Sequence, residues 1–554
     1  MEGKKLNLKW VTETIGEDYK NWHKGDVVRI QAQTGTGKTL MVTGNDKVKG
    51  LIDRMKDYEN LIYICNRIEL KRQIKLDLLK KYSMEIPKFE NGKLNIEALD
   101  KVTKINNIVI TSYHAIAYSL LDNTYNSDNN NMDLFDYIIC DEMHFMLTDS
   151  SFNNLTRLTF GELINTYHKN AIKIFISATM DEMVKVIEKA VESSKNSFIK
   201  GNNLKLHTYN TGIDYSYLNT KYFKYIKDII TLIKNDKTNE KWLIFVTSKK
   251  NGQDMKNELD ECNISNDFIT SGSKTVEAKN ITSESKFNCK VLISTKALDN
   301  GVNIKDDKVK NLVVMAFDKT TFIQEIGRVR FNILNAPTIN LYIRTCYKKT
   351  FTNLVDRIYE PKFQDCQLYM NDKSKFGRKY HNNLSSLADD LFYIDNETKN
   401  ITLNKIGYAR LIKDGSFAKV MIEKFENEGD FAFIKEQLRW LGLEDTFKKD
   451  NLIEDITKED NIDTLKGFLK DAYSEKKYFY KEKFIEDIMK IINNDENLKV
   501  LFNKISGNGN RAKGAKMFNK LFTSDKVNLD YVVCTEKKTI NGERKNYWFV
   551  QCTL

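Results

Sequence analysis

The sequence is poor in the residues that mark linkers, metal sites and exported proteins. Three prolines in 554 residues leave no proline-rich linker to separate domains. The eight cysteines form no CxxC pair, and no two histidines stand at ligand spacing, which gives a zinc site little support. No apolar run approaches the roughly 18 residues of a membrane span, and residues 1–16 lack the apolar core of a signal peptide. We therefore expect a cytoplasmic protein with reduced cysteines and no membrane partner.

What the chain does have is an excess of positive charge and enough apolar residues for packed cores. Lys and Arg number 87 against 76 Asp and Glu, which gives a formal net charge of +11 and a pI of about 8.9. Hydrophobic residues make up 41% and aromatics 11%, a composition that argues against wholesale disorder. A basic balance favours an anionic partner, most commonly nucleic acid, although charge alone is a weak indicator.

From about residue 25 to 335, short apolar runs alternate with amphipathic stretches. Runs such as Val27–Ile30, Leu61–Cys65 and Tyr137–Cys140 are apolar throughout, which is typical of strands buried on both faces. Such strands form parallel sheets with helical crossovers, so the predicted fold class is α/β. The pattern pauses in a polar stretch between about 195 and 238. We therefore predict two α/β domains, over residues 1–200 and 201–350.

Beyond residue 350 the buried-strand pattern fades. Residues 351–505 are predicted to form a mainly helical accessory region, and 506–554 a small separate module. In the latter, Tyr531–Thr535 and Asn546–Cys552 are strand-like and flank Asn541-Gly542, a strong hairpin signal. A helix is expected before this hairpin, over about residues 512–522. Helix followed by hairpin, with a basic end, suggests a winged-helix-like module.

Two basic segments of this C-terminal third are candidate nucleic-acid contacts. The sequence KSKFGRKYH (Lys373–His381) interleaves basic and aromatic residues, a pattern suited to backbone contact and base stacking. The alternative is a solvated loop. The other candidates are basic residues of the terminal helix and hairpin tip, for which a solvated helix face is the alternative: Arg511, Lys513, Lys516, Lys520, Arg544 and Lys545.

The segment RIQAQTGTGKT (Arg29–Thr39) follows a short apolar strand and precedes helix-forming sequence, which is the context of a phosphate-binding P-loop. Gly35 and Gly37 let the backbone curl so that successive N–H groups face a phosphate. Lys38 would reach the β- and γ-phosphates, and Thr39 would hold Mg²⁺ through its hydroxyl. The predicted cofactors are thus ATP and Mg²⁺, bound by Thr34, Gly35, Thr36, Gly37, Lys38 and Thr39.

About a hundred residues later, DYIICDEMH (Asp136–His144) places two acids at the carboxyl end of a buried strand. Ligands bind at such strand ends in parallel sheets. Asp141 is placed to hold Mg²⁺, and Glu142 to polarise the attacking water. An acid pair after a strand is common by chance, but its combination with a P-loop favours the functional interpretation. His144 taken alone is equally explained as a strand-end histidine.

The order and spacing of further motifs resemble those of the superfamily-two helicases of the DExH type, which have two tandem RecA-like domains. The resemblance covers about residues 20–345, about 60% of the chain. The compact chain and its composition also suggest a phage or mobile-element origin. The segments that carry the resemblance are Leu61–Gln73, Val109–Ala115, Phe175–Thr179, Leu243–Lys250, Ile269–Ser273, Val291–Ile304 and Phe322–Phe331.

This resemblance implies roles for individual residues. ATP is expected between the two domains, with a nucleic-acid strand crossing both. Contact with that strand is implied for Arg67, Thr111, Ser112, Thr247, Thr270 and Thr295. For Thr270 and Thr295 the alternative is a hydroxyl at a strand end that caps a helix. His144, Ser177 and Thr179 are implied to couple hydrolysis to domain movement. Contact with the nucleotide from the second domain is implied for Gly301, Asn303, Gln324, Arg328 and Arg330.

Three departures from the family pattern leave questions open. The family's last motif usually has arginines four and seven residues after its glutamine; here Arg328 matches, but position 331 is Phe and an arginine stands at 330. Which arginine dominates is left open. Asn303 stands where many members have Asp. No adenine-reading glutamine motif is evident upstream, where Trp22 is a candidate base contact or, alternatively, a core residue.

The sequence thus predicts an ATP-dependent helicase or translocase that favours DNA. It is expected to move from 3′ to 5′, as family members usually do. Two alternatives remain: an RNA helicase, and a nucleic-acid-binding scaffold that uses ATP as a conformational clamp without unwinding. Protein partners, if any, are expected to bind the C-terminal region.

Overall fold

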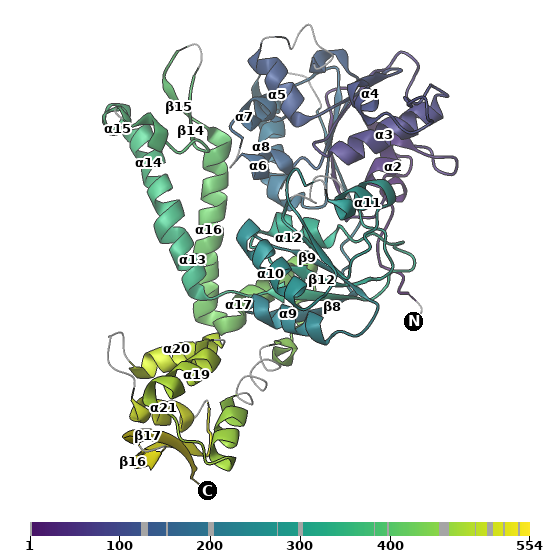
Figure 1. The fold of residues 1–554 in the computed structure, drawn as a ribbon. Coiled ribbons are helices and arrows are strands. Elements are labelled where there is room, and N and C mark those ends of the chain that lie inside the picture. Colours follow the sequence, from purple (N-terminus) through teal and green to yellow (C-terminus); the bar gives the residue numbers. More distant parts are fainter. Residues whose placement is uncertain are drawn as a thin grey trace. The chain divides into compact units, whose positions relative to one another are not determined.

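The protein is described by a computed structural model (Figure 1). It describes residues 3–553 apart from 123, 125–130, 151–152, 198–203, 274, 297–302, 382, 396–397, 454–464, 494, 507–513, 525–526 and 541–542. The chain divides into two compact units. The first comprises Met1–Ile226 and Leu232–Asn451, and the second comprises Lys227–Thr231 and Leu452–Leu554.

The first unit begins with a seven-stranded sheet in the order β3-β4-β2-β5-β6-β1-β7, hereafter lobe 1. All neighbouring strands run parallel except β3 and β4. The central strands are buried along their whole length, which is why their sequences are mostly apolar. The strands are β1 (Val27–Gln31), β2 (Leu61–Ile64), β3 (Lys104–Ile105), β4 (Ile108–Thr111), β5 (Tyr137–Asp141), β6 (Ile172–Ser177) and β7 (Leu206–Asn210).

Helices connect these strands: α1 (Val11–Ile15), α2 (Lys38–Thr43), α3 (Ile68–Lys81), α4 (Ile96–Lys101), α5 (Tyr113–Leu121), α6 (Phe145–Asp149), α7 (Thr156–Phe160) and α8 (Asp181–Ser197). Two apolar clusters cover the two faces of the sheet. Because β7 pairs with β1, the first sheet continues past residue 200.

Lobe 2 is a six-stranded, all-parallel sheet in the order β10-β11-β9-β12-β13-β8. Its strands are β8 (Leu218–Phe223), β9 (Lys241–Phe245), β10 (Asn266–Ile269), β11 (Val291–Ser294), β12 (Val309–Val314) and β13 (Ile339–Arg344). The helices between them are α9 (Ile226–Asn235), α10 (Lys249–Glu261), α11 (Val276–Glu284) and α12 (Lys319–Ile326). Two parallel sheets of RecA-like type followed by helices confirm the predicted fold class.

The accessory helices of the first unit follow β13: α13 (Lys348–Leu354), α14 (Glu360–Asn371), α15 (Lys373–Tyr380), α16 (Lys405–Glu428) and α17 (Ala432–Leu441). A small hairpin, β14 (Phe392–Ile394) and β15 (Ile401–Leu403), precedes α16. The candidate basic-aromatic segment at 373–381 forms α15. Its Phe376 and Tyr380 are buried against α14 and the hairpin, so their rings are not available to stack on bases.

The long helix α16 contacts lobe 1 directly and is joined to lobe 2 through α17. Near its N-terminus, the Arg410 guanidinium donates to the carbonyl oxygens of Leu147 (3.0 Å) and Thr148 at the end of α6 in lobe 1. Near its C-terminus, Phe425 packs on Phe351 of α13, which in turn packs on Phe433 of α17. The α17 helix then packs on lobe 2, where Trp440 meets Phe322 of α12. The accessory region therefore connects the two lobes by a second route.

The second unit has its own apolar core, built around Phe484, Phe518 and Trp548. Residues 465–474 are helical and are followed by α19 (Lys481–Asn493), α20 (Glu496–Ser506) and α21 (Ala515–Phe522). Strands β16 (Tyr531–Ile540) and β17 (Glu543–Cys552) pair as the predicted antiparallel hairpin. The predicted Asn541-Gly542 turn, Arg511 and Lys513 lie outside the described residues. Among the described helices of both units, none is long and apolar enough to cross a membrane.

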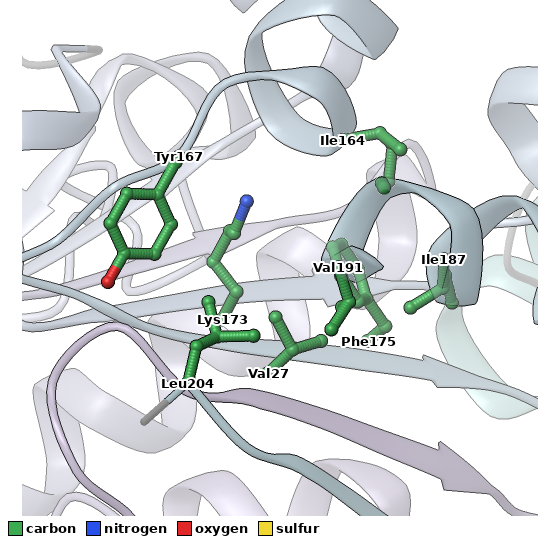
Figure 2. A pocket seen from close by; sticks show the side chains of 9 residues that line it. Val27, Ile164, Tyr167, Lys173, Phe175, Ile187, Val191 and Leu204 are labelled. Atoms are coloured by element: carbon green, nitrogen blue, oxygen red, sulfur yellow. The ribbon is translucent and has the colours of Figure 1, made fainter. Parts of the chain in front are cut away.

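One lysine is enclosed in the core of lobe 1. Lys173 on β6 extends between Val27, Val191 and Leu204, beside a cavity of about 10 Å³ that has room for one water molecule at most (Figure 2). Its Nζ donates to the carbonyl oxygens of Leu163 (3.2 Å) and Thr166 (2.8 Å). Burial lowers the pKa of Lys173 to about 8. The side chain thus caps carbonyl groups at the cost of burying an ammonium group.

This buried lysine predicts a pH-dependent stability. Below pH about 8 Lys173 is charged in both the folded and unfolded states, and folding bears the full desolvation cost. Between about 8 and the ordinary lysine pKa the unfolded chain binds more protons, so stability rises with pH. In the wild type this rise in the free energy of unfolding should amount to at most about 3 kcal/mol. A Lys173→Met variant should not show it. Melting temperatures measured from pH 7 to 10.5 would test this, with exposed Lys169→Met as the control; parallel curves for all three proteins would contradict it.

Candidate active site and nucleic-acid cleft

The predicted P-loop connects β1 to α2. Gly35 (φ 93°) and Gly37 (φ 82°) adopt left-handed backbone conformations that side chains disfavour. The ring of Trp10 packs against Gly37, so this position has no room for a side chain either. The Thr36 hydroxyl is buried and donates to the carbonyl oxygen of Gln33 at 2.7 Å, which stabilises the loop rather than leaving it free for a ligand. Lys38 begins α2.

The two acids lie where β5 ends. The Lys38 ammonium forms an ion pair with the Glu142 carboxylate, with Nζ and Oε1 2.8 Å apart. Glu142 itself has a left-handed backbone (φ 50°), which is uncommon for a side-chain-bearing residue and is a strain that recurs at functional sites. Asp141 accepts a hydrogen bond from the Tyr63 hydroxyl at 2.8 Å, and its backbone carbonyl accepts one from Tyr113 at 2.9 Å.

Tyr63 and Tyr113 were not predicted as part of the site. Tyr63 lies in an otherwise apolar strand, β2, directly beside β5 in the sheet. A hydroxyl in a fully buried strand needs a partner, and the strand order supplies Asp141. This signal is present in the sequence but becomes specific only once the neighbouring strand is known.

The pKa values of Glu142 and Asp141 are shifted in opposite directions by their surroundings. Burial alone would raise the pKa of Glu142, but the neighbouring Lys38 and Arg67 hold it well below its ordinary value. Burial and the adjacent Glu142 charge instead raise the pKa of Asp141. Glu142 is therefore ionised, and the two neighbouring acids differ in proton affinity.

The residues present fit a nucleotide with a divalent cation. Among the described residues the Asp141 Oδ1 atom is buried and has no hydrogen-bond partner. An unsatisfied carboxylate oxygen inside a protein is costly, and Mg²⁺ is a hard cation that prefers such oxygens. The half-buried Thr39 stands at the N-terminus of α2, beside Lys38. Backbone N–H groups of the P-loop and this lysine supply the positive environment that phosphates need.

Lobe 2 contributes Gln324 to the same cluster. The Arg67 guanidinium of lobe 1 donates to the Gln324 side-chain carbonyl and stands 3.3 Å from the Glu142 carboxylate. Gln324 donates in turn to Glu142 at 3.3 Å. Arg328 is buried and its Nη2 donates to the same Gln324 carbonyl oxygen at 2.8 Å. A continuous set of polar contacts therefore joins the P-loop lysine of lobe 1 to the arginine of lobe 2.

Arg330 lies near this set but has a different hydrogen-bond partner. Its Nε donates to the side-chain oxygen of Asn303 at 2.7 Å, so two residues with predicted nucleotide roles contact each other. Burial and the nearby Arg67 charge lower the pKa of Arg330 to about 10, which leaves it charged at neutral pH. Gly301 lies outside the described residues.

The three predicted coupling residues are brought together. His144 and Ser177 share a hydrogen bond of 2.7 Å between Nδ1 and Oγ. The Thr179 backbone N–H donates to the same Ser177 hydroxyl at 3.1 Å. The second ring nitrogen of His144 is 3.3 Å from the Gln324 amide nitrogen. This segment after β6 is thus linked through His144 to both Glu142 and lobe 2.

A cleft of about 950 Å³ opens between the lobes beside these acids. It is lined by three of the predicted nucleic-acid contacts, Arg67, Thr247 and Thr295, and also by Lys249 and Lys296. The other three predicted contacts do not line it. Thr111 is buried, and the Ser112 hydroxyl caps α5. Thr270 contacts Ser273, with the two hydroxyls 3.2 Å apart.

Trp22 does not lie at the nucleotide site. Its ring is buried in the core of lobe 1 and its Nε1 donates to the Tyr209 hydroxyl at 2.9 Å. The core alternative is therefore correct. The aromatic residue that contacts the P-loop is Trp10, which is not among the predicted site residues.

Comparison with known proteins agrees with this geometry. Residues 17–187 match the model of the DEAD/DEAH box helicases, and residues 222–332 match the helicase conserved C-terminal domain. The chain therefore carries the two domains of a superfamily-two helicase. Its general class is that of the nucleic-acid helicases, which hydrolyse ATP, generally with Mg²⁺.

Solved structures with a similar fold are more distant. Dbp5 of S. cerevisiae bound to RNA and ADP BeF3 is 18% identical, with 57% of this chain and 79% of that chain covered and a TM-score of 0.38. The DUF1998 helicase MrfA bound to DNA is 14% identical over 75% and 59% of the two chains, with a TM-score of 0.42. The Mycobacterium smegmatis helicase Lhr bound to ssDNA and AMP-PNP is 12% identical, with 73% of this chain and 59% of that chain covered and a TM-score of 0.38. No curated protein matches the chain.

Proposed function

We propose that the protein is a nucleic-acid-stimulated ATPase that moves along a DNA strand, from 3′ to 5′, and separates or remodels duplexes. The observation that carries this proposal is the set of contacts from Lys38 through Glu142 and Gln324 to Arg328. This set supports the proposal because the residues to which we assign phosphate binding, water activation and charge stabilisation are in contact at one boundary between two lobes. The same boundary borders the cleft lined by Arg67, Thr247 and Thr295.

The P-loop and the acids would perform the chemistry. Lys38 would exchange the Glu142 carboxylate for the β- and γ-phosphates, while Thr39 and Asp141 would hold Mg²⁺. The metal supplies charge neutralisation at the phosphates when it is bound. Glu142, released from Lys38, would orient and polarise the attacking water. Arg328 would approach the γ-phosphate from lobe 2 and stabilise its developing charge.

Movement would follow from the same contacts. Gln324 contacts Arg67, Glu142 and His144, so a change at the phosphates reaches lobe 2 through one side chain. Hydrolysis would change which of these contacts are available and so bias the lobes between two arrangements. The hydroxyls of Thr247 and Thr295, with Lys249, would grip phosphates more tightly in one arrangement. Such contacts read the backbone, so little sequence preference is expected.

DNA is favoured over RNA by the second unit, where α21 precedes the β16–β17 hairpin as in winged-helix modules. The test is the steady-state ATPase rate with no nucleic acid, single-stranded DNA, duplex DNA and single-stranded RNA, with Lys38→Ala as the inactive control. We expect at least tenfold stimulation by single-stranded DNA. Stimulation by RNA alone would assign an RNA helicase, and no stimulation by any of them would exclude the motor.

A further inference from the structure

A short extended segment at Phe479 lies beside the hairpin of the second unit and forms a single β-bridge with it. Phe479 pairs with Trp548 of β17 through two backbone hydrogen bonds, of 2.8 and 2.9 Å, while its ring packs among Phe468 and Phe484 in the core. Side chains alternate along a strand, so Tyr478 and Tyr480 face away from the core. They meet the side chains of β17 on that outer side: Tyr478 contacts Phe549, and Tyr480 contacts Tyr547.

We call this surface the outer sheet face; it consists of Tyr478, Tyr480, Lys538, Lys545, Tyr547 and Phe549. Lys538 and Lys545 are opposite each other in the hairpin register. The Lys538 ammonium lies 4.0 Å from the centre of the Tyr478 ring, and that of Lys545 lies 5.3 Å from the Tyr480 ring. Tyr480 is 47% exposed although its neighbour Tyr547 is buried beneath it.

The charge around the outer sheet face is positive. The sequence around the bridged Phe479 reads KKYFYK from Lys476 to Lys481, and both terminal lysines of this run are exposed. Lys538 and Lys545 are exposed on the distal part of the same face of the hairpin. Glu536 is the acid that points to this face, where its carboxylate accepts a hydrogen bond from the Tyr478 hydroxyl at 3.3 Å. Basic residues thus border a layer of aromatic rings.

We propose that the outer sheet face binds single-stranded nucleic acid as a second site, separate from the cleft between the lobes. Unstacked bases have two flat faces that stack on exposed aromatic rings, and lysines at the rim contact the phosphates. A cation–π contact at an exposed site is weaker than base stacking. A base can therefore take the place of Lys545 over the Tyr480 ring while the ammonium turns to a phosphate. A duplex presents no free base faces, so it lacks the stacking contribution.

The test uses the full chain without nucleotide and a fluorescent oligothymidine, with binding followed by anisotropy over a range of NaCl concentrations. Tyr480→Ala is expected to weaken binding about tenfold with an unchanged salt dependence, because it removes stacking and no charge. Tyr480→Phe keeps the ring and should stay within about twofold of the wild type. Removing both Lys538 and Lys545 by substitution with Ala should flatten the slope of log K against log salt by about 1.4, since each phosphate contact contributes about 0.7.

The matched control removes two exposed lysines from α19 of the same unit, Lys483→Ala with Lys490→Ala, and should leave binding unchanged. The proposal would be overturned if Tyr480→Ala bound oligothymidine as tightly as the wild type does. It would also be overturned if this substitution weakened the binding of duplex more than the binding of single strands. The same titrations with an oligouridine RNA show whether the site prefers DNA or RNA. The Lys38→Ala variant separates this site from the proposed motor: it should lose ATP hydrolysis and keep oligothymidine binding at Tyr480.

Discussion

Replacing Glu142 by Gln is expected to lower the rate of ATP hydrolysis by at least about a hundredfold, because general-base catalysis contributes about 10²- to 10⁴-fold. Gln keeps the size of the side chain but cannot accept the proton of the attacking water. Nucleotide binding should persist, since Lys38, Thr39 and Asp141 are unchanged. Loss of the Lys38–Glu142 ion pair should even strengthen nucleotide binding, because Lys38 no longer has a competing carboxylate partner.

Phosphate release at saturating nucleic acid measures the first effect, and titration with a fluorescent ATP analogue measures the second. Glu188→Gln is the matched control, because Glu188 is a lobe 1 glutamate of α8 that pairs with Arg29 at the surface and not with Lys38. Hydrolysis by Glu142→Gln within threefold of the wild type would assign the base to another group.

Replacing Arg328 by Ala is expected to lower the single-turnover hydrolysis rate by about a thousandfold, within the range known for arginines that stabilise a transferring phosphoryl group. Arg330→Ala should lower it by less than about tenfold by comparison, since that side chain holds Asn303 instead. The structure thus favours Arg328 where the motif spacing left the two arginines equal. Its Nη2 is joined through Gln324 to Glu142, whereas Arg330 is not.

Arg328 is fully buried, so its loss could also unfold the protein. An Arg328→Lys variant retains the charge but not the planar fork, and should recover part of the melting temperature and little of the rate. A larger rate loss in Arg330→Ala than in Arg328→Ala would reverse the assignment.

The elements of the lobes were predictable because each depends on local pattern. Fully apolar runs became fully buried strands, and the glycines of the P-loop have the backbone angles that the motif requires. The two motifs that meet in the ion pair of Lys38 with Glu142 stand at the carboxyl ends of β1 and β5, which are separated in the sheet by β6 alone. The terminal hairpin followed from its turn signal, although its strands are longer than predicted.

Other contacts depend on how distant segments meet, and one sequence does not contain that information. Arg67 was assigned to nucleic acid, yet its guanidinium contacts Gln324, 257 residues later, and Glu142. The burial of Phe376 and Tyr380 was open to prediction, because aromatics four residues apart lie on one helix face. The basic residues between these two aromatics had instead suggested contact with nucleic acid. The β-bridge at Phe479 in the second unit was not predicted, because a single bridged pair produces no detectable sequence period.

The helix α16 has 24 residues, which corresponds to a length of about 36 Å, and it is attached near one end to lobe 1 and near the other to lobe 2 through α17. An α-helix resists stretching, so α16 sets the separation between its two attachment points. The lobes are consequently not free to turn about their linker alone, and each turn must shift the helix at one attachment. At the lobe 1 end, Arg410 donates to two carbonyl oxygens and Ile406 is buried in the lobe 1 core, while the other end is held by ring contacts among Phe351, Phe425 and Phe433. In the proposed motor, the travel of the lobes in each cycle would therefore be limited by a helix that belongs to neither lobe.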